Sequence, residues 1–180
     1  GCNINGTFIN HLMYADDSCL IAPCPSALQD LVDICETFAI NNCIVYNAKK
    51  SNCMCFKPPV YKQLYIPPIY LDAKPLVFVE CQKYVGMNIS NDLTDDVDIK
   101  RQVKAMYVRG NMLVHNFNFC LDNVKQNLFK CYCTNSYGSE LWSLYKKETY
   151  KKCVVAYNDI YRKLFNIRRG ESMSALYVLN

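Results

Sequence analysis

Two adjacent aspartates, Asp16 and Asp17, are the residues of this sequence best suited to chemistry. They lie between two short apolar runs, residues 12–14 (Leu-Met-Tyr) and residues 19–21 (Cys-Leu-Ile). Apolar runs on either side of a short polar turn predict a β-hairpin, which would present both carboxylates at its tip. Paired carboxylates suit Mg²⁺, and two such ions about 3.5–4 Å apart can hold the attacking and leaving oxygens of a phosphoryl transfer. The alternative is an ordinary solvated turn, because Asp is common in turns.

Length and composition indicate a globular protein. The chain has 180 residues, of which 51% are hydrophobic and 20% charged. This is enough for one sizeable core, or for one domain with a smaller appendage, and it is too apolar for a disordered chain. No apolar run approaches the roughly 20 residues that cross a bilayer, and no signal-peptide pattern opens the sequence. We therefore expect no membrane partner.

Twelve cysteines could indicate disulfides, but their spacing favours reduced thiols. Cys53 and Cys55 are separated by one residue, as are Cys131 and Cys133, and no Cys-x-x-Cys occurs. The spacing typical of zinc ligands is therefore absent. Free cysteine is often buried in cores, so we expect reduced core thiols and an intracellular protein.

Charge is distributed unevenly along the chain. Residues 1–99 hold six lysines against eleven acids, a balance of −5, whereas residues 100–180 hold fourteen Lys and Arg against five acids, a balance of +9. A basic half beside an acidic half suits a polyanionic partner, with a solvated helix surface as the alternative.

The first half of the chain predicts short strands around one helix. Asn5-Gly6 between residues 2–4 and 7–9 is a strong hairpin signal. Ser26 and Gln29 fit a capping box that opens a helix ending near Asn41. Beyond it we expect strands over 44–46 and 53–56, an irregular stretch over 61–68, a hairpin over 69–78 around Asp72-Ala73-Lys74, and a strand over 84–89. The apolar face of the helix would contain Leu28, Leu31, Val32, Cys35, Phe38 and Ala39.

The second half predicts three antiparallel helices with basic outer faces. Thr94 can cap the first, whose apolar positions continue to Phe117. The others are expected over 123–133 and 149–166. The polar side of the first helix carries Lys100, Arg101, Lys104 and Arg109. The fold class is therefore α+β, with one domain over 1–93 and a helical one over 94–180.

Several segments resemble reverse transcriptases. Residues 14–17, Tyr-Ala-Asp-Asp, resemble the Tyr-x-Asp-Asp box of that family, and Asn47, Lys50 and Ser51 fit its Asn-x-x-Lys-Ser pattern. Residues 84–89, Tyr-Val-Gly-Met-Asn-Ile, resemble the primer-grip strand. The segments follow in the family's order, and the resemblance is closest to reverse transcriptases of non-LTR (LINE-like) retrotransposons. Further matching strings are residues 10–17, 128–133, 137–138, 141–142 and 156–159.

The resemblance implies an RNA-directed DNA polymerase, with part of an antiparallel palm sheet and its packed helix in 1–93 and a helical thumb in 94–180. Asp16 and Asp17 would hold two Mg²⁺ ions, with Mn²⁺ as an alternative, during nucleotidyl transfer to a primer 3′-hydroxyl. Lys50 would stabilise or protonate the leaving pyrophosphate, with a solvated turn lysine as the alternative. Expected partners are an RNA template, a DNA primer, deoxynucleoside triphosphates and the remainder of the polymerase polypeptide, in a cytoplasmic ribonucleoprotein and the nucleus.

The resemblance also assigns residues around the primer. Tyr14 and Ala15 would line the floor under the primer terminus, and Tyr84, Val85 and Gly86 would hold it. A strand glycine without a ligand is the alternative for Gly86. The four basic residues of the first thumb helix would grip the template–primer backbone, namely Lys100, Arg101, Lys104 and Arg109.

One departure from the family limits the expected activity. Its palm uses a further aspartate on an earlier strand, and these 180 residues contain no acid before Asp16. The fingers are not represented either. We therefore expect a reverse-transcriptase fragment that does not polymerise alone. Two alternatives are a nucleic-acid-binding module without catalysis and a vestigial product of a decayed retroelement.

Overall fold

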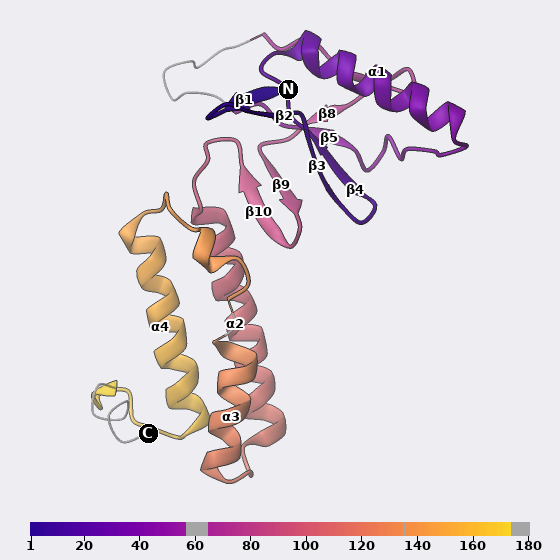
Figure 1. Cartoon of the computed structure of the whole chain (residues 1–180). Helices are drawn as coiled ribbons and strands as arrows, with labels where there is room; N and C mark the ends of the chain where they lie inside the picture. The colour runs from indigo at the N-terminus through magenta and orange to yellow at the C-terminus, as the bar shows by residue number, and fades with distance from the viewer. Residues whose placement is uncertain (57–64, 135, 174–180) are drawn as a thin grey trace. The chain divides into compact units, whose positions relative to one another are not determined.

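The structure is a computed structural model that describes residues 1–56, 65–134 and 136–173 (Figure 1). It is mixed α+β, which confirms the predicted fold class at that level. The chain divides into two compact units, Gly1–Val85 and Gly86–Asn180, so the division falls before the boundary predicted at residue 93. None of the helices in the described ranges is long and apolar enough to cross a bilayer.

Unit 1 begins with two hairpins. β1 (Cys2–Ile4) and β2 (Thr7–Ile9) pair antiparallel across Asn5 and Gly6, whose φ angles are 49° and 83°. Two positive φ angles are what a type I′ turn requires, so the predicted Asn-Gly hairpin is confirmed. β3 (His11–Tyr14) and β4 (Asp17–Leu20) form the second hairpin.

The helix of unit 1, α1 (Pro25–Asn41), begins without the predicted capping box. Its N-cap is Cys24, and no side chain caps it. The Gln29 amide instead accepts a hydrogen bond from the Tyr70 N–H (2.8 Å) and donates one to the Tyr70 carbonyl (3.0 Å). Gln29 thus fastens α1 to a distant segment. Val32 and Ala39 are buried as predicted, whereas Phe38 is 55% exposed.

The remaining strands of unit 1 are very short. β5 (Asn52–Cys53) pairs parallel with β8 (Val77–Phe78), and β6 (Tyr70–Leu71) pairs antiparallel with β7 (Lys74–Pro75). The turn between β6 and β7 consists of Asp72 and Ala73 alone. The predicted three-residue turn is therefore wrong at Lys74, which belongs to β7. The strand predicted over 44–46 does not form. The irregular stretch predicted over 61–68 lies partly outside the described residues.

The described strands do not join into the continuous antiparallel sheet that the sequence suggested. They form separate two-stranded ladders, one of them parallel. Prolines 67, 68 and 75 donate no ladder hydrogen bond, and turns with positive φ at residues 5–6, 15, 72–73 and 85 end the short strands. The small core of this unit consists of the buried residues Val32, Cys53, Ile69 and Leu71.

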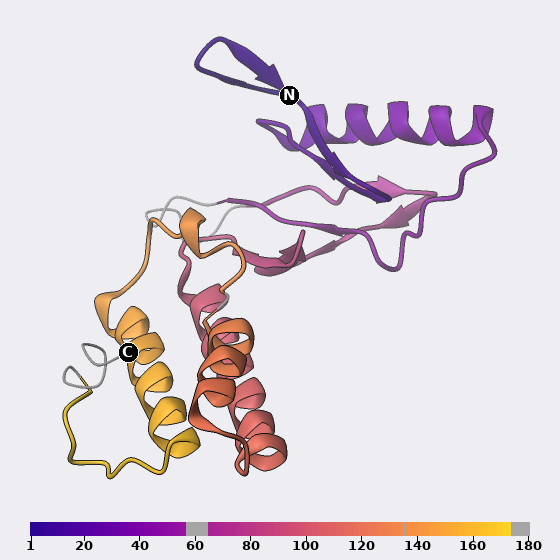
Figure 2. The same ribbon diagram turned by 60° about the horizontal axis from the view of Figure 1, so that its bottom comes forward.

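Unit 2 contains the three predicted helices. β9 (Cys81–Tyr84) leads through the turn at residues 85–86, where the units divide, into β10 (Met87–Ser90). Then follow α2 (Asp96–Phe117), α3 (Asp122–Cys133), the 3₁₀ turn η1 (Ser139–Leu141) and α4 (Lys147–Leu164), which Figure 2 shows from a second direction. The N-cap of α2 is Asp95, so the predicted cap Thr94 is wrong; the Thr94 hydroxyl instead donates a hydrogen bond to Asp92 (2.9 Å).

α2 packs against both α3 and α4. Its Gly110 faces Ile160 of α4, and a Cβ built at Gly110 would lie 2.3–2.9 Å from the Ile160 side chain. Glycine therefore permits the close approach of these two helices. The buried core consists of Met106, Leu113, Phe129, Cys133, Ala156, Ile160, Tyr161, Leu164 and Met173.

Carboxylates at the start of α2 hold the segment that precedes α4. Asp95 accepts hydrogen bonds from the N–H groups of Ser143 and Leu144, both at 2.8 Å. Asp96 accepts one from the N–H of Lys146 at 3.1 Å. The backbone of residues 143–146 is therefore fixed against the first turn of α2.

Asp98 is the most buried of these acids, at 1% exposure. It accepts hydrogen bonds from Arg101 Nε (2.7 Å), the Asn88 N–H (2.9 Å) and Trp142 Nε1 (3.1 Å). Burial opposes its ionisation, but these donors outweigh burial and hold the pKa of Asp98 below its usual range. Asp98 thus links β10, α2 and the segment after η1.

Asp98→Asn is expected to lower the stability of unit 2 by about 1–3 kcal/mol at pH 7, because buried donors lose their charged acceptor. The lowered folded-state pKa means that the Asp98 contribution is complete above the unfolded value of about 3.9 and is lost as the pH falls through the folded-state value. Urea unfolding followed by Trp142 fluorescence should therefore show a weaker acid dependence in the variant. Exposed Glu140→Gln is the control, and equal stability of Asp98→Asn and the parent chain at pH 7 would contradict this role.

Candidate metal-binding hairpin

The β3–β4 hairpin presents Asp16 and Asp17 as predicted from the sequence. Tyr14 pairs with Asp17, so Ala15 and Asp16 form a two-residue tip and Asp17 begins the returning strand. Both aspartates are exposed. No hydrogen bond or ion pair between described residues uses either carboxylate. Both side chains are therefore available to an external cation.

Ala15 gives the tip an uncommon backbone conformation. Its φ is 53°, in the left-handed region that costs an L-residue roughly 1–2 kcal/mol. Two-residue hairpin loops require positive φ because their twist must match that of the strands. The tip is therefore held in this conformation by the ladder between β3 and β4.

The strand that leads to the tip exposes its apolar side chains. Leu12, Met13 and Tyr14 are 48%, 67% and 63% exposed. A run of exposed large apolar residues is typical of a surface that contacts another molecule.

Tyr84 lies against this hairpin. Its hydroxyl donates a hydrogen bond to the Leu12 carbonyl at 3.2 Å. Desolvation, followed by the negative charge of Cys19 when ionised and that of Asp17, raises the pKa of Tyr84 above its usual value. The structure therefore brings Tyr84 to the hairpin that carries the aspartates.

Val85 and Gly86 form a turn, so the strand predicted over 84–89 is wrong at its centre. β9 ends at Tyr84 and β10 begins at Met87. The φ angles of Val85 and Gly86 are 45° and 80°, which a strand cannot accommodate and a two-residue turn requires. A Cβ on Gly86 would lie 3.1 Å from the ring of Tyr137, so the glycine accommodates a side chain and not another backbone.

Lys50 lies in a turn as predicted, with its side chain exposed. The Asn47 carbonyl accepts hydrogen bonds from the N–H groups of Lys50 (3.0 Å) and Ser51 (3.1 Å) and from the Ser51 hydroxyl (3.1 Å). The residues of the Asn-x-x-Lys-Ser pattern therefore stabilise the turn in which they lie. Within the described part of the chain, no hydrogen bond or ion pair joins Lys50 to the aspartates.

The four basic residues of α2 differ in their surroundings. Lys100 and Lys104 are exposed and one helical turn apart. Arg101 forms an ion pair with buried Asp98 at 2.7 Å, and Arg109 Nε donates to the Ala105 carbonyl at 3.2 Å. Lys100 and Lys104 are therefore the two best placed to contact a polyanion. The i,i+3 spacing of Asp98 and Arg101 is the sequence signal for the ion pair.

No group of three or more His, Cys, Asp or Glu residues that could hold a metal occurs in residues 1–56, 65–134 and 136–173. Mg²⁺ is commonly bound by one or two carboxylates together with substrate phosphates and water. The donor set of Asp16 and Asp17 fits that mode of binding.

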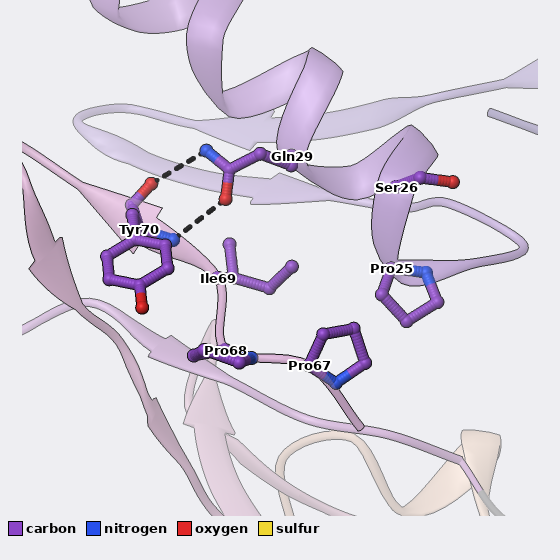
Figure 3. Close-up of a pocket in the computed structure, with 7 residues that line it drawn as sticks. All are labelled: Pro25, Ser26, Gln29, Pro67, Pro68, Ile69 and Tyr70. Atoms are coloured by element: carbon purple, nitrogen blue, oxygen red, sulfur yellow. Dashed lines mark hydrogen bonds between the residues drawn. The ribbon is translucent and has the colours of Figure 1, made fainter. Parts of the chain in front are cut away.

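A pocket of about 430 Å³ lies beside α1, and none of these groups lines it (Figure 3). Both polar ends of the Gln29 amide are used by the Tyr70 backbone, so the lining is largely apolar. The lining residues are Pro25, Ser26, Gln29, Pro67, Pro68, Ile69 and Tyr70. This set contains no carboxylate, histidine or thiol, and the hairpin remains the stronger candidate for chemistry.

No protein-family model, curated protein or solved structure matches this chain.

Ala15→Gly is expected to stabilise the β3–β4 hairpin by up to about 1 kcal/mol, because glycine adopts positive φ without strain. Slower amide hydrogen exchange in residues 12–19 would report this gain. The control is Ala27→Gly in α1, where the same substitution should destabilise by about 1 kcal/mol because the position is helical. Faster exchange of the hairpin amides in Ala15→Gly would show that the tip does not have this conformation.

Proposed function

We propose that the chain is part of an RNA-directed DNA polymerase similar to the reverse transcriptases of non-LTR retrotransposons. The observation that carries this proposal is the pair of exposed carboxylates on the β3–β4 hairpin, with Asp16 in its two-residue tip and Asp17 directly after the tip. In it the Tyr-Ala-Asp-Asp sequence occupies the last residue of one strand, the tip and the first residue of the next strand.

Asp16 and Asp17 would bind Mg²⁺ or Mn²⁺, which when bound lowers the pKa of a primer 3′-hydroxyl and neutralises the triphosphate. The chain's own contribution is to hold two anionic oxygen donors on a ladder-anchored turn. Exposure of both residues leaves room for phosphate oxygens and water as further ligands.

Aromatic side chains lie beside these carboxylates. Tyr14 is directly across the ladder from Asp17, and Tyr84 is hydrogen-bonded to the same hairpin. Exposed Tyr14 would support the base or sugar of a primer terminus. Lys50 would contact phosphate from its exposed turn.

Unit 2 supplies a basic surface suited to a nucleic-acid backbone. Besides Lys100 and Lys104 of α2, the exposed side chains of Lys147, Lys151 and Lys152 lie on α4. Contacts of this kind bind phosphates without reading sequence, and their affinity falls steeply with salt.

The same basic surface supports a second candidate, a nucleic-acid-binding module without catalysis. A third, a vestigial product, is favoured by the exposed apolar strand β3, which would promote self-association. The first two candidates differ in whether binding depends on a divalent ion at the hairpin.

Mg²⁺ is expected to strengthen binding of the full chain to an RNA–DNA primer–template with a bound deoxynucleoside triphosphate, and Asp16→Ala should abolish that increase. Fluorescence anisotropy with and without Mg²⁺ measures both affinities. The matched control is Asp30→Ala, which removes an exposed carboxylate from α1. Affinity that is the same with and without Mg²⁺ in the parent chain would favour the non-catalytic module.

The same samples can be tested for primer extension. We expect none from these 180 residues alone, because two carboxylates are present where the family uses three. Clear extension would contradict this expectation while supporting the polymerase assignment.

A further inference from the structure

Two tyrosines stack on each other at the surface of unit 2. The rings of Tyr145, before α4, and Tyr150, in its first turns, have centroids 5.3 Å apart and planes inclined by 26°. Their side chains are 39% and 44% exposed. The ring contacts of Phe129, Tyr157 and Tyr161 belong instead to the bundle core. The Tyr145–Tyr150 pair therefore presents aromatic surface to an outside partner.

Exposed lysines neighbour this pair in the chain. Lys147 lies three residues before Tyr150 in α4, a spacing that places both on one side of the helix, Lys146 is the N-cap residue, and Lys151 follows Tyr150 directly. Glu148 is the acid in this first turn. Cations near a helix N-terminus are unfavourable to the helix dipole, and only part of this charge is offset, by the interaction of Lys146 with Asp96. A polyanion bound here would neutralise the remaining positive charge and cover the aromatic surface.

The backbone beneath the pair is fixed. Leu144 and Lys146, on either side of Tyr145, donate their N–H groups to Asp95 and Asp96. The Lys146 carbonyl in turn accepts the N–H of Tyr150 at 3.1 Å. Little ordering of the protein would therefore be required on binding, which favours affinity.

We propose that Tyr145 and Tyr150 form a stacking site for an unpaired base of a single-stranded nucleic acid, with Lys146, Lys147 and Lys151 contacting its phosphates. Aromatic side chains in a basic surface bind single strands through the faces of their bases. Bases within a duplex are covered by their neighbours and cannot offer these faces. This inference rests on the proposed function, because it specifies which part of a nucleic acid unit 2 contacts.

The test compares single-stranded and duplex binding by the full chain, using fluorescein-labelled twelve-nucleotide oligo(dT) and oligo(U) and a duplex of equal length. Tyr150→Ala should weaken single-strand binding by roughly five-fold or more, the lower range for one lost base–aromatic stack. Duplex affinity should change little. Tyr150→Phe should retain single-strand binding because the ring remains.

Three further variants separate stacking from general effects. Phe119→Ala removes another exposed aromatic of the same unit (86% exposed) and should leave single-strand affinity unchanged. Lys147→Gln should weaken the binding of both the single strand and the duplex. It should also reduce the slope of log K against log salt concentration by about one. Tyr145→Ala, with Trp142 fluorescence to confirm folding, provides a second removal of the stacked pair.

The outcomes are distinguishable. Unchanged single-strand affinity in both Tyr→Ala variants, or equal losses for single strand and duplex, would overturn the stacking site and leave metal-dependent primer–template binding intact. Absence of binding to both nucleic acids by the parent chain would overturn this inference and the proposed function together. Selective loss of single-strand binding in both variants would support the site.

Discussion

Unit 2 depends on three carboxylates at the start of α2. Negative charge there is favoured by the helix dipole, and each of these acids also accepts hydrogen bonds from other segments of the chain. Asp98 fixes β10 and the Trp142 indole, while Asp95 and Asp96 fix the backbone that leads into α4. The contact between Gly110 and Ile160 then allows α2 and α4 to pack closely within the bundle. The stacked tyrosines are positioned by the same acids, so the proposed binding surface shares its support with the fold.

Features set by neighbouring residues could be predicted from the sequence. Asn5-Gly6 accommodates two positive φ angles, and apolar runs around Asp16-Asp17 suffice for a ladder with a short tip. The three helices of unit 2 could be predicted because their apolar periodicity extends over many residues. The prediction of a helix therefore holds even where its first or last residue is misplaced. For the candidate site, this local information located the carboxylates, Tyr14 and the exposed turn of Lys50.

Features set by distant partners could not be predicted in the same way. Gln29 matched a capping box, but its amide bonds Tyr70, 41 positions away, because that backbone passes beside α1. Val85 is a β-branched residue with strong strand propensity, yet the turn to Met87 imposes positive φ on it. Arg101 matched the basic face of an amphipathic helix, but buried Asp98 engages its guanidinium. In each case a tertiary contact or turn geometry outweighed the local pattern.

We propose that the exposed hairpin tip binds a divalent cation in the presence of nucleic acid. Paramagnetic Mn²⁺, added to the isotope-labelled full chain with a primer–template, would test it through the amide resonances of the chain. We expect the resonances of residues 14–18 to broaden first. The double substitution of Asp16→Asn with Asp17→Asn should remove the broadening, whereas Asp30→Asn should not. Broadening centred on the acids of residues 92–98, with residues 14–18 unaffected, would contradict it.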